Sequence, residues 1–130
     1  MRSLAVVLVA GSLILAACGK PADPAAVEQA VTPCGTGLTT LGNLADMANA
    51  GAQDPNYAAQ AQQVAMACRA ARPRLAALKA PKACREVAEA TEGAANALKA
   101  AFTGGNAGDP SAALAAADRA GVACTEALSR

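Results

Sequence analysis

The chain has 130 residues and a mass of 12.7 kDa, which is the size of one domain. Thirty-nine residues are alanine, whereas there is one tyrosine, one phenylalanine, no tryptophan and no histidine. Without histidine the chain has no histidine-containing catalytic triad and no histidine ligand for zinc or haem. The net charge of +1 is not the basic balance of nucleic-acid-binding proteins, so we expect no nucleic-acid partner.

The first 18 residues have the pattern of a bacterial export signal. Arg2 is followed by an apolar run from Leu4 to Leu15, and the run ends in Leu-Ala-Ala-Cys at Cys18. About a dozen apolar residues are typical of a secretory signal peptide and are too few to span a bilayer comfortably. The final four residues resemble the lipobox of bacterial lipoproteins. That resemblance, which covers residues 1–18 only, implies cleavage before Cys18 and acylation of this cysteine.

The resemblance implies a cleaved signal peptide (residues 1–17) and a lipidated Cys18, which begins a short tether (18–23). From the residue pattern we expect the remainder (24–130) to form a helical domain. More than one acyl chain on Cys18 is enough for stable membrane anchoring. Gly19, not aspartate, follows the cysteine, which in lipoproteins of enteric type favours outer-membrane sorting. We therefore expect a protein of the bacterial cell envelope, anchored in the outer membrane with its domain in the periplasm.

Beyond the tether, the sequence predicts only helices. Asp23, Asp54 and Asp109 each place an N-cap acceptor before a proline, and Pro81-Lys82 gives a fourth start with a weaker cap. Apolar and small residues recur at alternating spacings of four and three, as in the buried faces of antiparallel bundles. The expected buried positions are Val27, Val31, Cys34, Leu38, Leu41, Ala45 and Ala48; Tyr57, Ala61, Val64, Cys68, Ala71, Leu75 and Leu78; Cys84, Val87, Thr91, Ala94, Leu98 and Ala101, with Phe102 alongside; and Leu114, Ala117, Gly121, Cys124 and Leu128. We expect an all-α fold, a small antiparallel up-down four-helix bundle of two helical hairpins.

Two prolines lie inside the expected helices. Pro33 and Pro73 each remove a backbone hydrogen bond and should kink or split the helix that contains them. Gly35 and Gly37 follow the first of these prolines closely. We therefore expect a break at residues 33–37 in preference to one at Pro73.

Beyond the lipobox there are four cysteines, and all lie on expected buried faces. An even number in an exported chain indicates two disulfides. In an antiparallel hairpin, residues equidistant from the turn lie at the same height. We therefore favour Cys34–Cys68 and Cys84–Cys124, since the midpoint of each pair falls in an expected loop. Cys68–Cys84 with Cys34–Cys124 stays open as the alternative, because it fits a turn near Ala76.

The alternative to disulfides is a metal site built from thiolates. Soft thiolate and thioether ligands suit Cu(I), and Met47 and Met66 would be available as further ligands. The wide separation of the cysteines differs from the short paired spacings of a Cys₄ zinc site. No Cys-x-x-Cys redox motif is present either. We therefore favour structural disulfides and expect no metal and no cofactor.

Six basic residues lie around the junction of the second and third expected helices. They are Arg69, Arg72, Arg74, Lys79, Lys82 and Arg85. In an up-down bundle this junction lies at the same end as the lipid anchor, so the cluster could face anionic headgroups. We favour the simpler interpretation, a solvated helix face that is partly balanced by Lys82–Glu86 and Arg85–Glu89 pairs at i,i+4.

The opposite end of the expected bundle carries Met47, Tyr57 and Phe102, beside a glycine-rich loop at residues 104–108. If exposed, these side chains would form a patch for an envelope protein partner. We favour a cap on the hydrophobic core, because Tyr57 lies on an expected buried face.

The carboxylates of Glu86, Glu89 and Glu92 recur three residues apart on the third expected helix. Paired carboxylates can perform acid–base catalysis, but no substrate-binding motif accompanies these. We expect them to face solvent and expect no enzymatic activity. The expected function is that of a membrane-anchored envelope lipoprotein acting as a non-catalytic structural or protein-interaction module. The alternative is a small-ligand or copper-binding module of the envelope.

Overall fold

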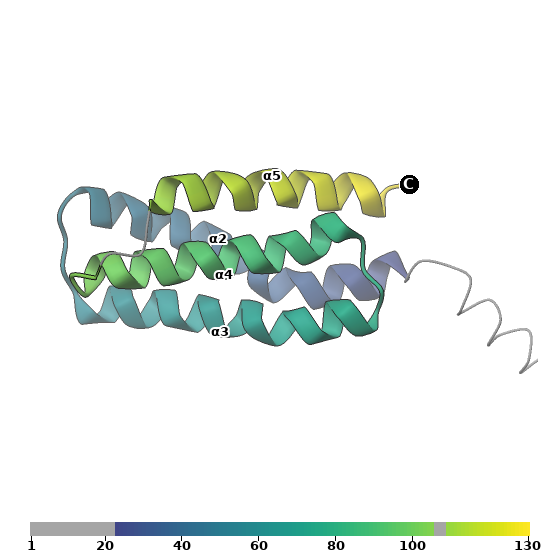
Figure 1. Ribbon diagram of the computed structural model, residues 1–130, viewed down its shortest axis with the longest axis horizontal. Coiled ribbons are helices and arrows are strands. Elements are labelled where there is room, and N and C mark those ends of the chain that lie inside the picture. The colour runs from purple at the N-terminus through teal and green to yellow at the C-terminus, as the bar shows by residue number, and fades with distance from the viewer. Residues whose placement is uncertain (1–22, 106–108) are drawn as a thin grey trace, which may run out of the picture.

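The computed structural model describes residues 23–105 and 109–130, which form four α-helices and no strand. The helices are α2 (Pro24–Asn49), α3 (Pro55–Ala77), α4 (Lys82–Phe102) and α5 (Pro110–Leu128). Consecutive helices run antiparallel (Figure 1). The predicted all-α four-helix fold is confirmed. We call the end that holds the start of α2, the α3–α4 connection and the end of α5 the near end, and the opposite end the far end.

Three helices start as the sequence predicts. The carboxylates of Asp23, Asp54 and Asp109 accept hydrogen bonds from the backbone N–H two residues further on, at 3.2, 2.8 and 2.9 Å. In each case proline is the first helical residue, where its missing N–H costs nothing. The start of α4 follows Pro81 and has no side-chain cap, also as expected.

The C-termini of α2, α3 and α4 share one motif. Each is followed by a residue with positive φ, which is 81° at Gly51, 53° at Lys79 and 76° at Gly104. The next residue then donates its N–H to a carbonyl five positions back, as Ala80 does to Leu75 at 3.0 Å. This arrangement satisfies carbonyls that have no partner inside the helix, and it normally uses glycine. Lys79 is the one residue other than glycine with positive φ in the described parts of the chain.

The break predicted at residues 33–37 is wrong, because α2 continues through Pro33 without interruption. The physical reason is the position of the proline on the solvent face. The carbonyl that loses its donor belongs to Gln29, which is exposed like Pro33, so water can solvate it. The same holds in α3, where Pro73 and Arg69 are both exposed and the helix is again continuous.

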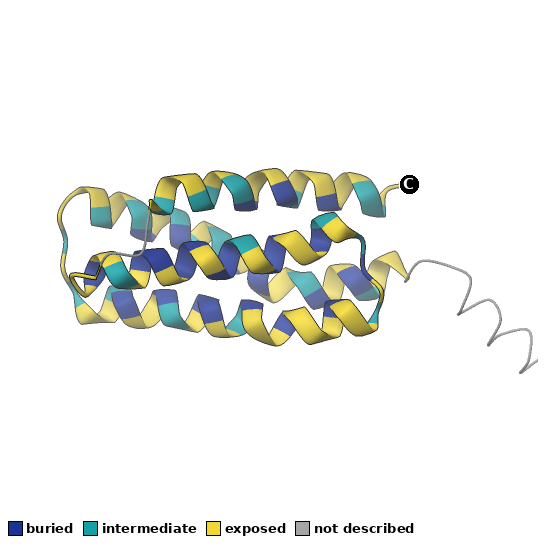
Figure 2. Ribbon diagram, in the orientation of Figure 1, coloured by how far each residue is buried: buried dark blue, intermediate teal, exposed yellow. Residues whose placement is uncertain are grey.

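The central helix of the bundle is α4. It packs against all three other helices, whereas α3 and α5 lie on opposite sides of it and do not contact each other. Ten residues of α4 are buried but only three of α5, and Figure 2 shows the buried positions following α4 along its length. Because α2 also packs diagonally onto α4, the contact between α2 and α5 is the least extensive among neighbouring helices. This arrangement leaves a groove between α2 and α5.

The hydrophobic core consists mainly of alanine and cysteine. The large residues that are fully buried include Val27, Leu41, Leu75 and Leu98. Ala101, an expected buried position, is exposed, and its neighbour Phe102 is buried instead. Within the described residues, no helix has the length and apolar character that a membrane span requires.

Candidate functional site

The four cysteines of the domain form two disulfides. Cys34 is bonded to Cys68 and Cys84 to Cys124, each with an S–S distance of 2.05 Å. The favoured pairing is therefore confirmed, and the alternative connectivity is excluded in this structure. The first bond links α2 to α3 and the second links α4 to α5. All four residues are buried, with exposed fractions of 3% or less.

The disulfides bear directly on the copper-binding alternative. A sulfur atom in a disulfide is not a thiolate, so these cysteines offer a metal ion no anionic ligand. Met47 and Met66 do not point to a buried sulfur site, since they are 45% and 58% exposed. Residues 23–105 and 109–130 contain no group of three or more histidine, cysteine, aspartate or glutamate residues that could hold a metal ion.

The candidate acylation site lies outside the described residues. This applies to Cys18, to the signal peptide at residues 1–17 and to the tether before Asp23. Part of the glycine-rich loop, residues 106–108, is also outside. The described domain begins at the near end of the bundle, so the chain enters it from the same end as the α3–α4 connection (Figure 1).

The predicted basic cluster divides into two groups. Arg69 and Arg72, near the end of α3, both donate to the carboxylate of Glu92 on α4. The Arg69 Nε to Glu92 Oε1 distance is 3.1 Å, and the Arg72 Nη1 to Glu92 Oε2 distance is 3.3 Å. Arg72 also lies 3.9 Å from Glu89. The prediction that Glu92 faces solvent is wrong, because its side chain is only 11% exposed between these arginines.

The remaining cations make fewer contacts. Lys82 pairs with Glu86 at 3.7 Å, as predicted, although its side chain is 82% exposed. The expected Arg85–Glu89 pair does not form. Among the described residues, no carboxylate lies within 4.0 Å of a charged nitrogen of Arg74, Lys79 or Arg85. These side chains are directed into solvent around the α3–α4 connection.

The candidate partner patch at the far end does not exist as an exposed aromatic surface. Phe102 is 5% exposed, and its ring centroid lies 5.4 Å from that of the half-buried Tyr57. The two rings lie in the tilted arrangement that aromatic pairs prefer. They close the far end of the core. Of the three residues, only Met47 remains substantially exposed.

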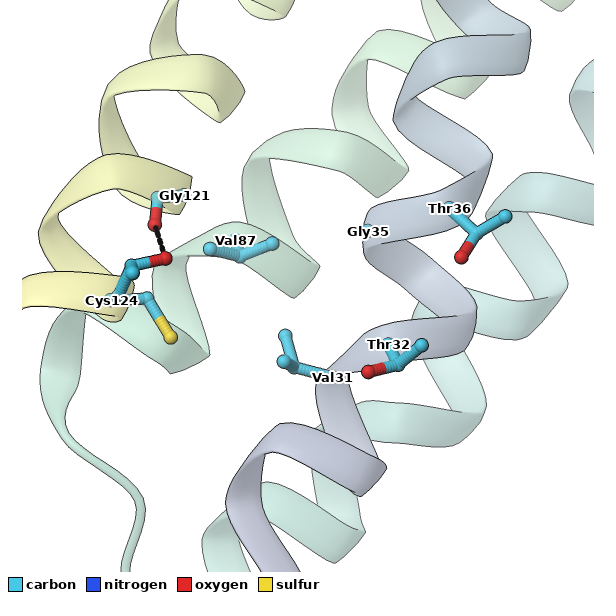
Figure 3. A pocket seen from close by; sticks show the side chains of 8 residues that line it. Val31, Thr32, Gly35, Thr36, Val87, Gly121 and Cys124 are labelled. Atoms are coloured by element: carbon cyan, nitrogen blue, oxygen red, sulfur yellow. Dashed lines mark hydrogen bonds between the residues drawn. The ribbon is translucent and has the colours of Figure 1, made fainter. Parts of the chain in front are cut away.

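A cavity between α2 and α5 was not anticipated from the sequence. Its volume is about 370 Å³, and α4 contributes Val87 to its floor. The lining residues are Val31, Thr32, Gly35, Thr36, Val87, Gly121, Cys124 and Thr125. Figure 3 shows Val31 of α2 and Cys124 of α5 on the two sides of the cavity, with Val87 of α4 between the two helices. A second cavity of about 390 Å³ continues the groove past Gly35 toward the far end, alongside Leu38 and Leu114.

The groove exists because small residues face each other across it. A Cβ atom added at Gly35, Gly42 or Gly121 would meet no atom within 4 Å. Two threonine hydroxyls in the lining already donate to their own helices: Thr32 to the Glu28 carbonyl at 2.6 Å, and Thr125 to the Gly121 carbonyl at 3.0 Å. The first cavity contains no charged side chain and no activated nucleophile. Its lining suits the binding of an uncharged, largely apolar group.

The fold and the site define a small four-helix bundle with one disulfide in each hairpin and an apolar groove between its first and last helices. Comparisons of the chain with protein families, with curated proteins and with solved structures found no match.

Proposed function

We propose that the protein is a lipoprotein of the bacterial cell envelope whose helical bundle serves as a non-catalytic structural or protein-interaction module. One observation carries the proposal: a lipobox-like sequence ending at Cys18 directly precedes a domain with two disulfides. Disulfides persist in oxidising compartments such as the periplasm, which is where an acylated Cys18 would hold the domain. The lipobox-like sequence and the two disulfides are independent features, and both support a location in the cell envelope.

The dense cross-linking also suits a module that works outside the cytoplasm. Few large residues fill the core, and both hairpins depend on covalent closure. Between the two ends, the bundle presents exposed surfaces rich in alanine, from which Met66 and Val122 protrude at 58% and 61% exposure. With Met47 at the far end, these are the exposed large apolar side chains that residues 23–105 and 109–130 offer an envelope protein partner.

The test is the intact mass of the protein taken from its native envelope, alkylated with and without prior reduction. We expect a mass increase that corresponds to acyl chains on Cys18, and alkylation of the other cysteines only after reduction. A Cys18→Ser variant is the control, and it should lose the added mass and remain as a precursor. An unmodified N-terminus in the native protein would contradict the anchoring. Four thiols alkylated without reduction would contradict the structural role of the cysteines.

A second candidate function rests on the groove between α2 and α5. Its first cavity, at about 370 Å³, falls within the range of small-molecule sites, about 300–1,000 Å³. A module that binds a small apolar ligand there would show saturable binding of the uncharged fluorophore N-phenyl-1-naphthylamine. Gly121→Leu would fill the cavity and abolish this binding, whereas Gly93→Leu, at an exposed glycine on α4, would not. Equal binding by both variants would exclude the groove as the site.

A further inference from the structure

The near end carries four exposed cations that the carboxylates of the bundle leave largely free. They are Arg74, Lys79, Lys82 and Arg85, and we call them the basic corner. Arg74 lies in the last turn of α3, Lys79 in the connection, and the other two in the first turn of α4. Within the described residues, their one ion pair is the 3.7 Å contact between Lys82 and Glu86, which is open to solvent.

The two helices that carry the basic corner are linked to each other by the other two cations of the predicted cluster. Arg69 and Arg72 tie α3 to Glu92 on α4. The connection itself is short, and its backbone N–H groups are bonded to the end of α3. The four cations therefore project from two adjoining helix ends and from the short, hydrogen-bonded connection between them.

Two exposed carboxylates of α4 lie beside the basic corner: Glu86 pairs with Lys82, and Glu89 lies 3.9 Å from Arg72 of α3. The other acidic residues of the near end are Asp23 and Glu28 at the start of α2, and Glu126 on α5. Because α5 does not contact α3, Glu126 is on the far side of the central helix from the end of α3. The charge of the near end is therefore uneven: the α3–α4 connection carries four cations beside Glu86, whereas the start of α2 carries Asp23 and Glu28, and the end of α5 carries both Glu126 and Arg130. A negatively charged surface that approaches the near end would be attracted most strongly to the basic corner.

We propose that the basic corner docks the domain onto the anionic phospholipid headgroups of the membrane that anchors it. Charge complementarity is the basis: cations close to an anionic bilayer surface each strengthen binding about fivefold. The chain enters the bundle at this same end, so the anchor and the corner face one membrane. This inference rests on the proposed function for its geometry, and it sets the orientation of the bundle, with the far end and Met47 pointing away from the bilayer.

The test uses the chain from residue 18 onward with Cys18→Ser, which contains all four described helices and both disulfides but no acyl chain. We expect it to bind vesicles of phosphatidylcholine mixed with phosphatidylglycerol and not vesicles of phosphatidylcholine alone. Binding should weaken as sodium chloride is added, because salt screens exposed charges. Equal binding to both kinds of vesicle, or binding to neither, would overturn the proposal.

Two double variants with the same net charge locate the surface. Lys79→Gln/Arg85→Gln removes two cations from the basic corner, whereas Lys99→Gln/Arg119→Gln removes two exposed cations from the far end of α4 and from α5. We expect the first to weaken binding at least about fivefold and the second less than about twofold. Equal weakening would show that overall charge and not the corner is responsible, and would overturn the proposal.

A final measurement separates the membrane surface from a soluble phosphate as the ligand. Sodium phosphate and sodium chloride at equal ionic strength should displace the protein from vesicles equally. Stronger displacement by phosphate would assign the corner to a discrete phosphate site and overturn membrane docking. Because the protein tested has no acyl chain, failure here leaves the anchoring proposal intact. Conversely, an unmodified Cys18 in native protein would defeat the anchoring proposal alone.

Discussion

A Cβ atom placed on Gly37 would lie 2.6 Å from Cγ1 of Val64, a distance that side chains do not tolerate. The helices α2 and α3 therefore meet at this height only because position 37 has no side chain. One turn away, the bond between Cys34 and Cys68 joins the same two helices, with their Cα atoms 4.7 Å apart. The glycine and the disulfide together set the separation of the first hairpin.

Gly37→Ala is accordingly expected to destabilise the protein. Alanine normally stabilises a helix interior by about 1 kcal/mol relative to glycine. Here the added methyl group would overpack a core held by a disulfide, at a cost of about 1–3 kcal/mol. Val64 is β-branched and has little rotamer freedom with which to move aside. Urea unfolding monitored by circular dichroism should show a lower midpoint for the variant.

The control for this prediction is Gly42→Ala in the same helix. Nothing lies within 4 Å of a Cβ at Gly42, so the helix propensity gain of up to about 1 kcal/mol should be observed. Val64→Ala removes the two Cγ atoms that the added methyl group would meet. In a Val64→Ala background, Gly37→Ala should therefore lower the urea midpoint less than it does in the wild-type protein. If Gly37→Ala were as stable as Gly42→Ala, the close approach of α2 and α3 would be contradicted.

Glu92→Gln is expected to lower the free energy of unfolding by about 1–2 kcal/mol, because it removes the negative charge that two arginines share. This expected loss is smaller than that for a fully buried ion pair, because solvent screens the side chains of Arg69 and Arg72, which are 65% and 50% exposed. Thermal unfolding at low salt would measure the change. The matched control is Glu89→Gln, whose carboxylate is 60% exposed and 3.9 Å from Arg72. If Glu89→Gln lowered the free energy of unfolding as much as Glu92→Gln does, the central role of the buried Glu92 carboxylate would be contradicted.

Removal of the second disulfide should loosen α5 more than any other helix. The bond from Cys84 to Cys124 joins residues 40 positions apart, and the chain-entropy relation assigns such a bond about 4 kcal/mol. Although α5 packs along α4, only three of its residues are buried, fewer than in any other helix, so it has the least apolar burial to compensate for the lost bond. In Cys84→Ala/Cys124→Ala, amide hydrogen exchange should accelerate in α5 before it does in α2 and α3. Uniform acceleration across all helices would instead show that the bundle unfolds as one unit.

The disulfide pairing could be predicted because it follows from hairpin symmetry. Cys34 and Cys68 lie equally far from one turn, Cys84 and Cys124 from the other, and antiparallel helices bring such positions to the same height. The helix starts could be predicted for a local reason, since aspartate is a preferred N-cap residue and proline is a preferred first helical residue.

Features that depend on how the helices are arranged could not be predicted in the same way. The three glutamates of α4 look alike in the sequence, and Glu92 is buried only because α3 supplies two arginines above it. Similarly, glycines such as Gly35 and Gly121 often mark positions where two helices pack closely. Here they border a groove, because α2 packs more extensively against α4 than against α5. The burial of Glu92 and the position of the groove both depend on which helix lies at the centre of the bundle. Because the apolar faces of all four helices are rich in alanine, the sequence does not distinguish the central helix from the others.

The backbone at Lys79 provides the last prediction. Its φ of 53° lies in the left-handed region, where a residue with a Cβ atom is disfavoured by about 1 kcal/mol or more. Lys79→Gly and Lys79→Ala remove the same charge and the same side-chain contacts with water, so their difference isolates the backbone. We expect the glycine variant to be about 1 kcal/mol more stable than the alanine variant, the reverse of their order inside a helix. Chemical unfolding of the two proteins measures this difference. An alanine variant of equal or greater stability would show that α3 does not end in the left-handed conformation at this residue.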